Sequence, residues 1–425
     1  SVSSPRIEPP TPPVSQYVRA VSIRRGRQRE LGRIEAGTAT VVLDNRDRRF
    51  DPTNDASPYY PNVIPMKRIR IGATYGDGIL QWLFTGFIES WPQEYPEVGD
   101  AVVEVPCVDW FKLFNLYKLT IEDRVQELSG QRIIAVLEYI ANVVGAGGWY
   151  WTLASSDTDL YAPYSRLQLT TRLAYAWEDQ DVDAGQSEVQ SQPINEIALQ
   201  HLQAVAEAEQ GMLFVARDGR VTFRNRHARI RPTATPPVFG NVPGALPYNS
   251  LSIEYTDDQL WNKVIIERRG GTVPGIAEDR TSQAKYLQRT LQRSGLLITN
   301  DREAQAMAEY LVNRYANPQL VIRSMTISPE MDEALFSETF GRELGDRVLV
   351  RHRPPGPALE GQSPGPVIEQ LSFVEGIAWD ITPDRWQTTW QLSPADLETY
   401  WILAGTNADQ YAQFSKLEQS TRVAY

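Results

Sequence analysis

The stretch Trp386-Gln-Thr-Thr-Trp-Gln-Leu392 decides the fold class, because its residue types alternate. Trp386, Thr388, Trp390 and Leu392 alternate with the polar residues Gln387, Thr389 and Gln391. A period of two is typical of a half-buried strand. Similar runs predict strands at Thr38–Leu43, Arg68–Ile71, Ala101–Val108, Val264–Arg268, Leu320–Ser328 and Arg347–Arg351. The sequence therefore predicts an α+β, β-dominated fold.

Helix signals are fewer. Helix starts are predicted at Ser129, Asn195, Asn300 and Ser393-Pro394, which are residue types that cap or open helices. Glu303 stands three residues after Asn300, the spacing of a capping box, and predicts a helix over 299–317. Arg217-Asp-Gly-Arg220 separates two short apolar runs and predicts a hairpin turn.

Composition limits the function. The 425 residues carry 53 acidic and 42 basic side chains, a net charge of −11, and this balance argues against a protein that binds nucleic-acid phosphates through Lys and Arg. Hydrophobic residues make up 42% of the chain, enough to bury a core and to exclude disorder. The single cysteine, Cys107, excludes an intrachain disulfide framework and a cysteine-based zinc site.

The length predicts several domains, and two segments favour boundaries. One lies near residues 116–120, and the other is the Pro- and Gly-rich stretch 232–247. The net charges of residues 1–116, 117–245 and 246–425 are 0, −4 and −7, so the acidity lies in the later two-thirds of the chain. The carboxylates are spread along the sequence, which is typical of a solvated surface.

Two internal similarities stand out. Phe84-Thr-Gly-Phe-Ile-Glu-Ser-Trp91 is similar to Phe373-Val-Glu-Gly-Ile-Ala-Trp379, and each segment precedes another predicted strand. These two segments could be equivalent strands of duplicated barrels, although chance can also explain the similarity. Residues 167–175 also match residues 417–425 at five of nine positions, a similarity that chance can explain.

No residue pattern predicts a catalytic, cofactor-binding or metal site. The three histidines, His201, His227 and His352, are scattered, and we expect His201 at a surface or interface. The arginines beside His227 and His352 would disfavour an imidazolium but equally suit an exposed basic turn. The sequence contains no Gly-x-Ser-x-Gly elbow, no phosphate-binding Gly-rich loop and no His-Glu-x-x-His motif. We therefore predict a protein that is not an enzyme and has no cofactor.

Four aspartates gather in one predicted loop, at positions 44, 47, 51 and 55. Their spacing lacks the central glycine of a calcium loop, and Arg46, Arg48 and Arg49 lie between them. We expect turn-forming Asp side chains that pair locally with Arg.

Other carboxylates and aromatics give weaker signals. Asp257-Asp258 and Asp179/Asp181/Asp183 could supply the two carboxylates of a glycosidase, but any acidic chain of this size offers such pairs. Trp386 and Trp390 could belong to a sugar-binding platform, although alternating aromatics are more often core or interface residues.

The chain shows no apolar run long enough to span a membrane. Residues 1–13 are polar and Pro-rich without the apolar core of a signal peptide, so we expect synthesis in the cytosol.

The order of these features resembles minor tail or baseplate-hub proteins of long-tailed bacteriophages and related tail-derived particles. The similarity rests on Gly37–Pro52, Ser57–Pro61, Pro65–Ile71, Phe84–Ile88, Val105–Asp109, Ala204–Arg226, Tyr255–Arg268, Thr299–Asn317 and Gly376–Ser393. It covers most of the chain, and no single motif is diagnostic.

The resemblance implies a homotrimeric hub with two tail-tube-like β-barrels and smaller helix-plus-hairpin domains. It places the first barrel in residues 1–116, a helix-plus-hairpin α+β region in 117–245, the second barrel in 246–400 with the 299–317 helix inserted, and an extension in 401–425. Three chains with two similar barrels each would match a six-fold tube above and a three-fold surface below.

The implied location is the tail tip of the virion, after assembly in the host cytoplasm. The implied partners are a tail tube or distal tail protein above and tip, fibre or spike proteins below, while tape-measure protein and DNA pass through the lumen. Acidic residues would then help to line a channel that repels DNA, although the charge could equally serve solubility. A tail-associated cell-wall-degrading enzyme and a carbohydrate-binding adhesin are the alternatives.

Overall fold

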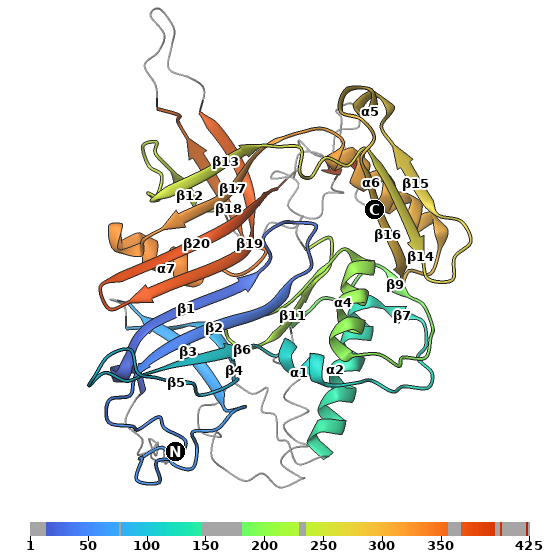
Figure 1. Ribbon diagram of the computed structural model, residues 1–425. Coiled ribbons are helices and arrows are strands. Elements are labelled where there is room, and N and C mark those ends of the chain that lie inside the picture. Colours follow the sequence, from blue (N-terminus) through green and yellow to red (C-terminus); the bar gives the residue numbers. More distant parts are fainter. Residues whose placement is uncertain are drawn as a thin grey trace, which may run out of the picture.

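The computed structural model describes residues 14–75, 78–146, 181–228, 235–355, 367–395, 400–401 and 422–423. Its largest element is a 12-stranded sheet with the strand order β13-β17-β20-β19-β1-β2-β6-β4-β3, from which β5, β12 and β18 branch. Figure 1 shows this sheet along one side of the molecule, with the helices α1, α2, α4 and α6 on the other. Within the described residues the strands form open sheets and close no barrel, so the predicted pair of barrels is not seen in the single chain.

The first half of the sheet is a five-stranded unit built by the first hundred residues, here called unit 1. It comprises β1 (Val18–Gly26), β2 (Glu35–Asp44), β3 (Arg68–Thr74), β4 (Leu80–Ile88) and β6 (Val102–Val108), with the short β5 (Gln93–Glu94) continuing β4 along β6. Adjacent strands are antiparallel in the order β1-β2-β6-β4-β3. The 3-10 helix η1 (Val14–Tyr17) precedes β1.

The second half, unit 2, repeats this order. It comprises β13 (Ser250–Tyr255), β17 (Leu320–Ile327), β18 (Arg347–His352), β19 (Ile368–Thr382) and β20 (Arg385–Pro394), with β12 (Val238–Gly240) beside β18. Its strands are antiparallel in the order β13-β17-β20-β19-β18. In both units the first, second, fifth, fourth and third strands follow one another across the sheet, so the chain contains one topology twice.

The registers of the two units agree as well. Arg68 of β3 lies opposite Phe87 of β4, and Arg347 of β18 lies opposite Phe373 of β19. The two similar segments found in the sequence therefore lie on equivalent strands. The pairing aligns Phe373 with Phe87, however, three residues after the Phe84 that the sequence similarity suggests.

The two units join where β1 pairs with β19, from Val21 opposite Ile381 to Gly26 opposite Gly376. Gly26 has a φ of +91°, and a Cβ on it would lie 2.3 Å from the carbonyl oxygen of Glu375. The Glu375 carboxylate is fully buried and accepts hydrogen bonds from Arg27 Nε at 2.7 Å and Ser393 Oγ at 2.5 Å. A buried ion pair thus stands directly at the joint.

Between the units the chain forms a helical layer. It contains α1 (Phe111–Leu116), β7 (Glu127–Leu128), α2 (Ser129–Ala146), β8 (Asp181–Val182), β9 (Glu188–Val189), α4 (Ala198–Glu209), β10 (Met212–Val215) and β11 (Val221–Arg224). The predicted hairpin is confirmed, because β10 and β11 pair around Gly219, whose φ of +94° suits glycine. Parallel pairing of β11 with β8 completes a three-stranded sheet.

A further α/β insertion lies between the first and second strands of unit 2. It contains β14 (Lys263–Arg268), β15 (Gly275–Glu278), α5 (Arg280–Tyr286), β16 (Thr290–Leu296) and α6 (Asp301–Tyr315), while η3 (Pro329–Met331) and α7 (Glu333–Gly341) follow β17. The predicted helix over 299–317 is confirmed as α6, with Asn300 Oδ1 accepting from the Glu303 amide at 2.8 Å. The last two described strands, β21 (Tyr400–Trp401) and β22 (Arg422–Val423), pair in parallel.

The alternation in Trp386–Leu392 is confirmed in β20. Trp390 is fully buried and packs edge-on against Phe239, whereas Gln391 is half-buried. All six further strand predictions also coincide with strands. A continuous cluster of buried apolar residues runs through both units and the elements between them, so the hydrophobic effect holds the parts together.

Two local predictions are wrong, and a third concerns residues most of which the structure does not describe. The cap of α4 is Ile197 rather than Asn195, and it makes no side-chain capping bond. Ser393 and Pro394 end β20 and do not open a helix. Proline can end a strand because the missing amide then breaks no ladder hydrogen bond. Residues 167–175 lie outside the described residues, as do most of 417–425.

Asp109 predicts a measurable pH dependence. Its carboxylate is buried and accepts from the amides of Gly37 at 2.6 Å and Phe111 at 2.9 Å, yet burial raises its pKa to about 7. The folded chain therefore keeps this proton between pH 4 and 7 while the unfolded chain loses it, so stability falls as pH rises through this window. The contribution is on the order of 4 kcal/mol.

We expect Asp109→Asn to flatten that dependence in urea unfolding measured from pH 4 to 8. Asp384→Asn, on the exposed turn between β19 and β20, is the control and should keep the original slope. An unchanged slope in Asp109→Asn would assign the pH dependence to other groups.

The buried pair at the joint predicts a second effect. Glu375→Gln removes the charge opposite Arg27 and should destabilise the fold by about 3–5 kcal/mol, since one partner of a buried pair is left uncompensated. The exposed pair Arg351–Glu369 offers a matched control, because Glu369→Gln should cost less than about 1 kcal/mol. Equal losses in urea unfolding would contradict a special role for the joint.

Candidate functional site

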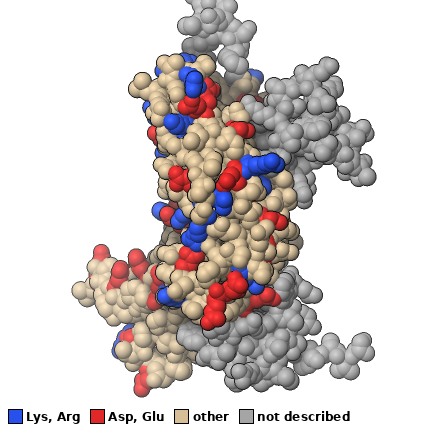
Figure 2. Space-filling model, turned by 90° about the vertical axis from the view of Figure 1, so that its right-hand side faces the viewer, with Lys and Arg blue, Asp and Glu red and all other residues tan. Residues whose placement is uncertain are grey.

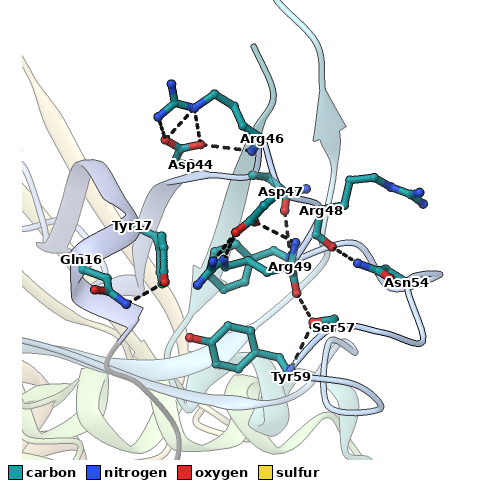
Figure 3. A network of polar contacts seen from close by, with 12 residues as sticks. Gln16, Tyr17, Asp44, Arg46, Asp47, Arg48, Arg49, Asn54, Ser57 and Tyr59 are labelled. Atoms are coloured by element: carbon teal, nitrogen blue, oxygen red, sulfur yellow. Dashed lines mark hydrogen bonds and ion pairs between the residues drawn. The ribbon is translucent and has the colours of Figure 1, made fainter. Parts of the chain in front are cut away.

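The loop between β2 and β3 carries the densest local network of charges predicted from the sequence, drawn in Figure 3. Asp44 pairs with Arg46 at 2.5 Å, Arg48 pairs with Asp51 at 2.7 Å, and Asp47 pairs with Arg49. The predicted local pairing is confirmed for Asp44, Asp47 and Asp51. Each of these three also accepts from a backbone amide two residues further on, the geometry of an Asx turn.

Two of these carboxylates, Asp44 and Asp51, are held in their charged form. Hydrogen bonds from Arg46 lower the pKa of Asp44 to about 2, and hydrogen bonds from Thr53 and Arg48 do the same for Asp51. Guanidinium groups thus occupy the positions that a cation would take. Within the described ranges no group of three or more His, Cys, Asp or Glu residues is arranged to hold a metal ion.

The same loop is anchored by aromatic stacking. Phe50 is buried and lies parallel to Tyr59 at 5.2 Å and to Trp91 at 6.2 Å between ring centroids. The side chain of Gln93 donates to the Phe50 carbonyl at 3.0 Å and accepts from Asn45 at 2.6 Å. The loop is therefore fixed against the chain segment that leads from β4 into β5.

Beyond that anchor the chain turns outward. The exposed residues of this turn are Pro92, Glu94, Tyr95, Pro96, Glu97 and Val98. Tyr95 is 66% exposed and Val98 is fully exposed. Tyr95 and Val98 thus extend into solvent beside a well-anchored loop, and we call residues 90–98 the rim segment.

The histidines form no catalytic arrangement. His201 is fully buried on α4, with Nδ1 2.7 Å from Glu196, and burial lowers its pKa. The expectation of a surface or interface position is wrong, because α4 packs against α1 and α2 and also against β10 and β16. His352 ends β18, hydrogen-bonded to Tyr248 at 2.5 Å, and His227 lies half-buried after β11.

The other carboxylate candidates are also engaged in ion pairs. Asp257 pairs with Arg289, and Asp258 pairs with Arg29 at 2.8 Å. Asp181 pairs with Arg224, while Asp183 accepts from the Asn225 amide at 2.9 Å. Asp179 lies outside the described residues. These aspartates bridge neighbouring segments of the fold.

The tryptophans Trp386 and Trp390 belong to the core, as the more frequent interpretation of such a pattern predicts. Trp390 is fully buried, and half-buried Trp386 packs against Phe340 and Trp379. Cys107 is buried as well, and burial raises the pKa of its thiol to about 12. Trp390 and Cys107 therefore expose no reactive or sugar-binding surface.

Sequence reasoning missed the buried acids Asp109 and Glu375, which tie strands together. Nothing in their local sequence marks them as buried, because their partners Gly37 and Arg27 lie far away in the chain. It also missed the rim segment, whose signal is the exposed aromatic Tyr95 between two prolines, Pro92 and Pro96.

Comparison with known proteins gives matches among solved structures alone. No family profile and no curated protein matches the chain. The 43 kDa tail protein of prophage MuSo2 from Shewanella oneidensis is similar with a TM-score of 0.49 and 12% identity, covering 89% of this chain and 95% of that one. A tail protein from Neisseria meningitidis MC58 is similar with a TM-score of 0.49 and 14% identity, covering 88% and 92%.

A third structure is the Escherichia coli c3393 protein, described as a type VI secretion component with structural similarity to the T4 bacteriophage tail proteins gp27 and gp5. Its TM-score is 0.41 and its identity 9%, covering 92% of this chain and 79% of that one.

No helix in the described ranges is long and apolar enough to cross a membrane.

The anchor of the loop can be tested by mutation. Phe50→Ala removes a buried ring from the stack with Tyr59 and Trp91 and should destabilise the protein by about 3–5 kcal/mol in urea unfolding. Val125→Ala, at a residue that is 64% exposed, should change stability by less than about 0.5 kcal/mol. A small effect at Phe50 would show that the loop is not anchored through this stack.

In these comparisons, therefore, the chain is similar over most of its length to phage tail proteins and to a secretion component described as resembling them.

Proposed function

We propose that the chain is a structural tail protein of a phage or tail-derived particle: a hub that joins the tail tube to the tail tip. The observation that carries the proposal is the duplicated five-stranded unit. A single chain with two copies of one topology can occupy two neighbouring positions of a ring, and the sequence features that resemble tail hubs accompany it.

The proposed assembly is a homotrimer. Three chains supply six similar units, and these would match a six-fold tube on one side of the ring. On the other side the three whole chains would form a three-fold surface. Tube or distal tail protein would bind above, and tip, fibre or spike proteins below. Each open half-sheet would complete a tube-like barrel, and the division into residues 1–116, 117–245, 246–400 and 401–425 stays a prediction.

The proposed channel passes tape-measure protein and DNA during ejection. Within the described residues many acids are paired with arginine, and Figure 2 shows acidic and basic side chains lying among one another on one face. We infer that the net acidic charge of residues 117–425 keeps DNA from binding the lumen. The chemistry of the proposed hub is assembly and release, without a covalent step.

Mass photometry with negative-stain imaging tests the assembly. We expect particles of three times 48.0 kDa and a three-fold ring with a central hole. Monomers at every concentration up to tens of micromolar would contradict the hub.

Murein digestion separates the hub from the enzymatic alternative. We expect the purified protein to release no soluble murein fragments, because the described candidate aspartates, Asp181, Asp183, Asp257 and Asp258, are engaged in ion pairs with arginine. Fragment release abolished by a point substitution would favour the cell-wall-degrading enzyme instead.

A further inference from the structure

The joint between the units shows how one unit binds the next. Strand β1, the first of unit 1, adds to the free edge of β19, the fourth of unit 2, beyond the point where β18 ends its pairing. Ser22 of β1 lies opposite Asp380 of β19 in this contact. A fourth strand therefore serves as the docking edge for a first strand.

The corresponding first strand of unit 2 lacks such a partner in the described chain. Strand β13 pairs with β17 alone and stands at the end of the sheet. It shares with β1 the pattern of an aliphatic residue followed by Ser-Ile, at Val21-Ser-Ile23 and Leu251-Ser-Ile253. Val21 and Ile23 are buried, whereas the β13 residues are half-buried or exposed, and Tyr255 is 67% exposed. An open strand edge of this kind is a template for pairing with another chain.

The docking edge in unit 1 follows from the register. In unit 2, Ser324 pairs with Gln391 of β20, and four residues earlier Gln387 pairs with Asp380. The equivalent of Ser324 in unit 1 is Thr40, because Ser22 pairs with Thr40 as Ser252 pairs with Ser324.

The same offset of four residues along β6 gives the position of the docking edge in unit 1. Thr40 pairs with Pro106 of β6, and four residues earlier Val102 pairs with Glu94 of β5. Glu94 thus holds in unit 1 the place of Asp380 in unit 2, and both residues carry a carboxylate. Residues 90–95 of the rim segment correspond to the docking edge 376–381 of β19.

We propose that β13 of one subunit pairs antiparallel with residues 90–95 of a second copy of this chain, repeating between subunits the contact of β1 with β19. Ser252 then lies opposite Glu94, and Leu251 lies opposite Tyr95. The inference rests on the proposed function in that the partner is another subunit of the ring.

The geometry of the molecule suits this contact. Figure 1 shows β13 near one end of the molecule and β5 near the other, so the two edges are different surfaces and the contact is head-to-tail. Such heterologous contacts form closed rings when the rotation closes. The contact would cover Tyr95, Tyr255 and Leu251, and cross-strand pairs of aromatic and aliphatic side chains stabilise sheets.

Polar groups also fit. Glu254 of β13 already has Arg323 at 3.1 Å, so it would not face the acidic Glu94 as an unpaired charge. Proline is tolerated on edge strands, so Pro92 is compatible with a docking edge on which some backbone hydrogen bonds are missing. The rim segment is held in place by the Phe50 stack, which limits the entropy lost on docking.

Disulfide trapping tests the register. Directly opposed residues have Cα atoms about 4.5–5.5 Å apart, within reach of a disulfide. The variants Ser252→Cys/Glu94→Cys and Leu251→Cys/Tyr95→Cys should form covalent dimers and trimers on mild oxidation, seen on non-reducing gels. In the control Ser252→Cys/Val98→Cys the second cysteine lies four residues beyond Glu94, in the turn that follows β5. It is therefore not opposite Ser252 in the proposed register, and cross-linking should be at least tenfold lower. The native Cys107 is buried and stays in all variants.

A second variant measures the interface without cysteine. Tyr95→Asp should raise the concentration of half-assembly at least tenfold in mass photometry, while the melting temperature of the dissociated monomer stays unchanged. Val125→Asp, at a residue that is 64% exposed outside the rim segment, should leave assembly unchanged.

The outcomes separate the two proposals. An intact trimer that neither opposed cysteine pair cross-links, and that Tyr95→Asp does not weaken, overturns the strand pairing while the hub stands. A protein that stays monomeric at every concentration overturns the hub itself, and the pairing with it.

Discussion

The pairing of β1 with β19 is the contact on which the rest of the fold depends, because it makes one sheet out of two units that are far apart in sequence. Gly26 and Gly376 lie opposite each other there, and a Cβ on either would lie within 3 Å of a backbone oxygen. Beside this close backbone approach, the buried Glu375 carboxylate pairs with Arg27 inside the core. Close strand packing and a buried ion pair thus meet at the same point of the sheet.

The helical layer locks that joint from the side. Arg25, the neighbour of Gly26, is buried and donates to the Val215 carbonyl of β10 at 3.1 Å while it pairs with Glu343, just after α7. Glu209 at the end of α4 is likewise buried and accepts from Ser129 and the Ser187 amide. Buried charges that cross between elements favour one arrangement of those elements, because any slip would leave a charge without its partner.

Local sequence patterns predicted what depends on neighbours along the chain. The alternation around Trp390, the cap at Asn300 and the Asp–Arg pairs of the loop 44–59 all involve residues within a few positions of one another. The failures depend on distant partners. His201 is buried because α4 packs on several sides. Ser393 lies in β20, where its hydroxyl donates to Glu375 of the neighbouring strand β19. The resemblance to tail proteins predicted two similar barrels. The common strand order of the two units could be recognised only from the strand pairing in the structure.

The two units differ where the chain leaves the shared topology. The first and second strands are joined by a short turn in unit 1, residues 27–34, whereas the same position in unit 2 holds the insertion of β14, β15, α5, β16 and α6. Between the second and third strands, unit 1 carries the Asp–Arg loop and unit 2 carries η3 and α7. Phe336 of α7 stacks on Tyr75 of unit 1 at 3.9 Å, so an insertion of one unit also packs on the other.

These insertions explain how a repeated scaffold can serve two symmetries. In the proposed ring the shared strands would present six similar edges, because strand order and register are the same in both units. The insertions occur once per chain and would therefore repeat three times. A six-fold partner needs contacts that avoid the insertions, and a three-fold partner needs contacts that include them, so the division between scaffold and insertion is also the division between the two faces of the proposed hub.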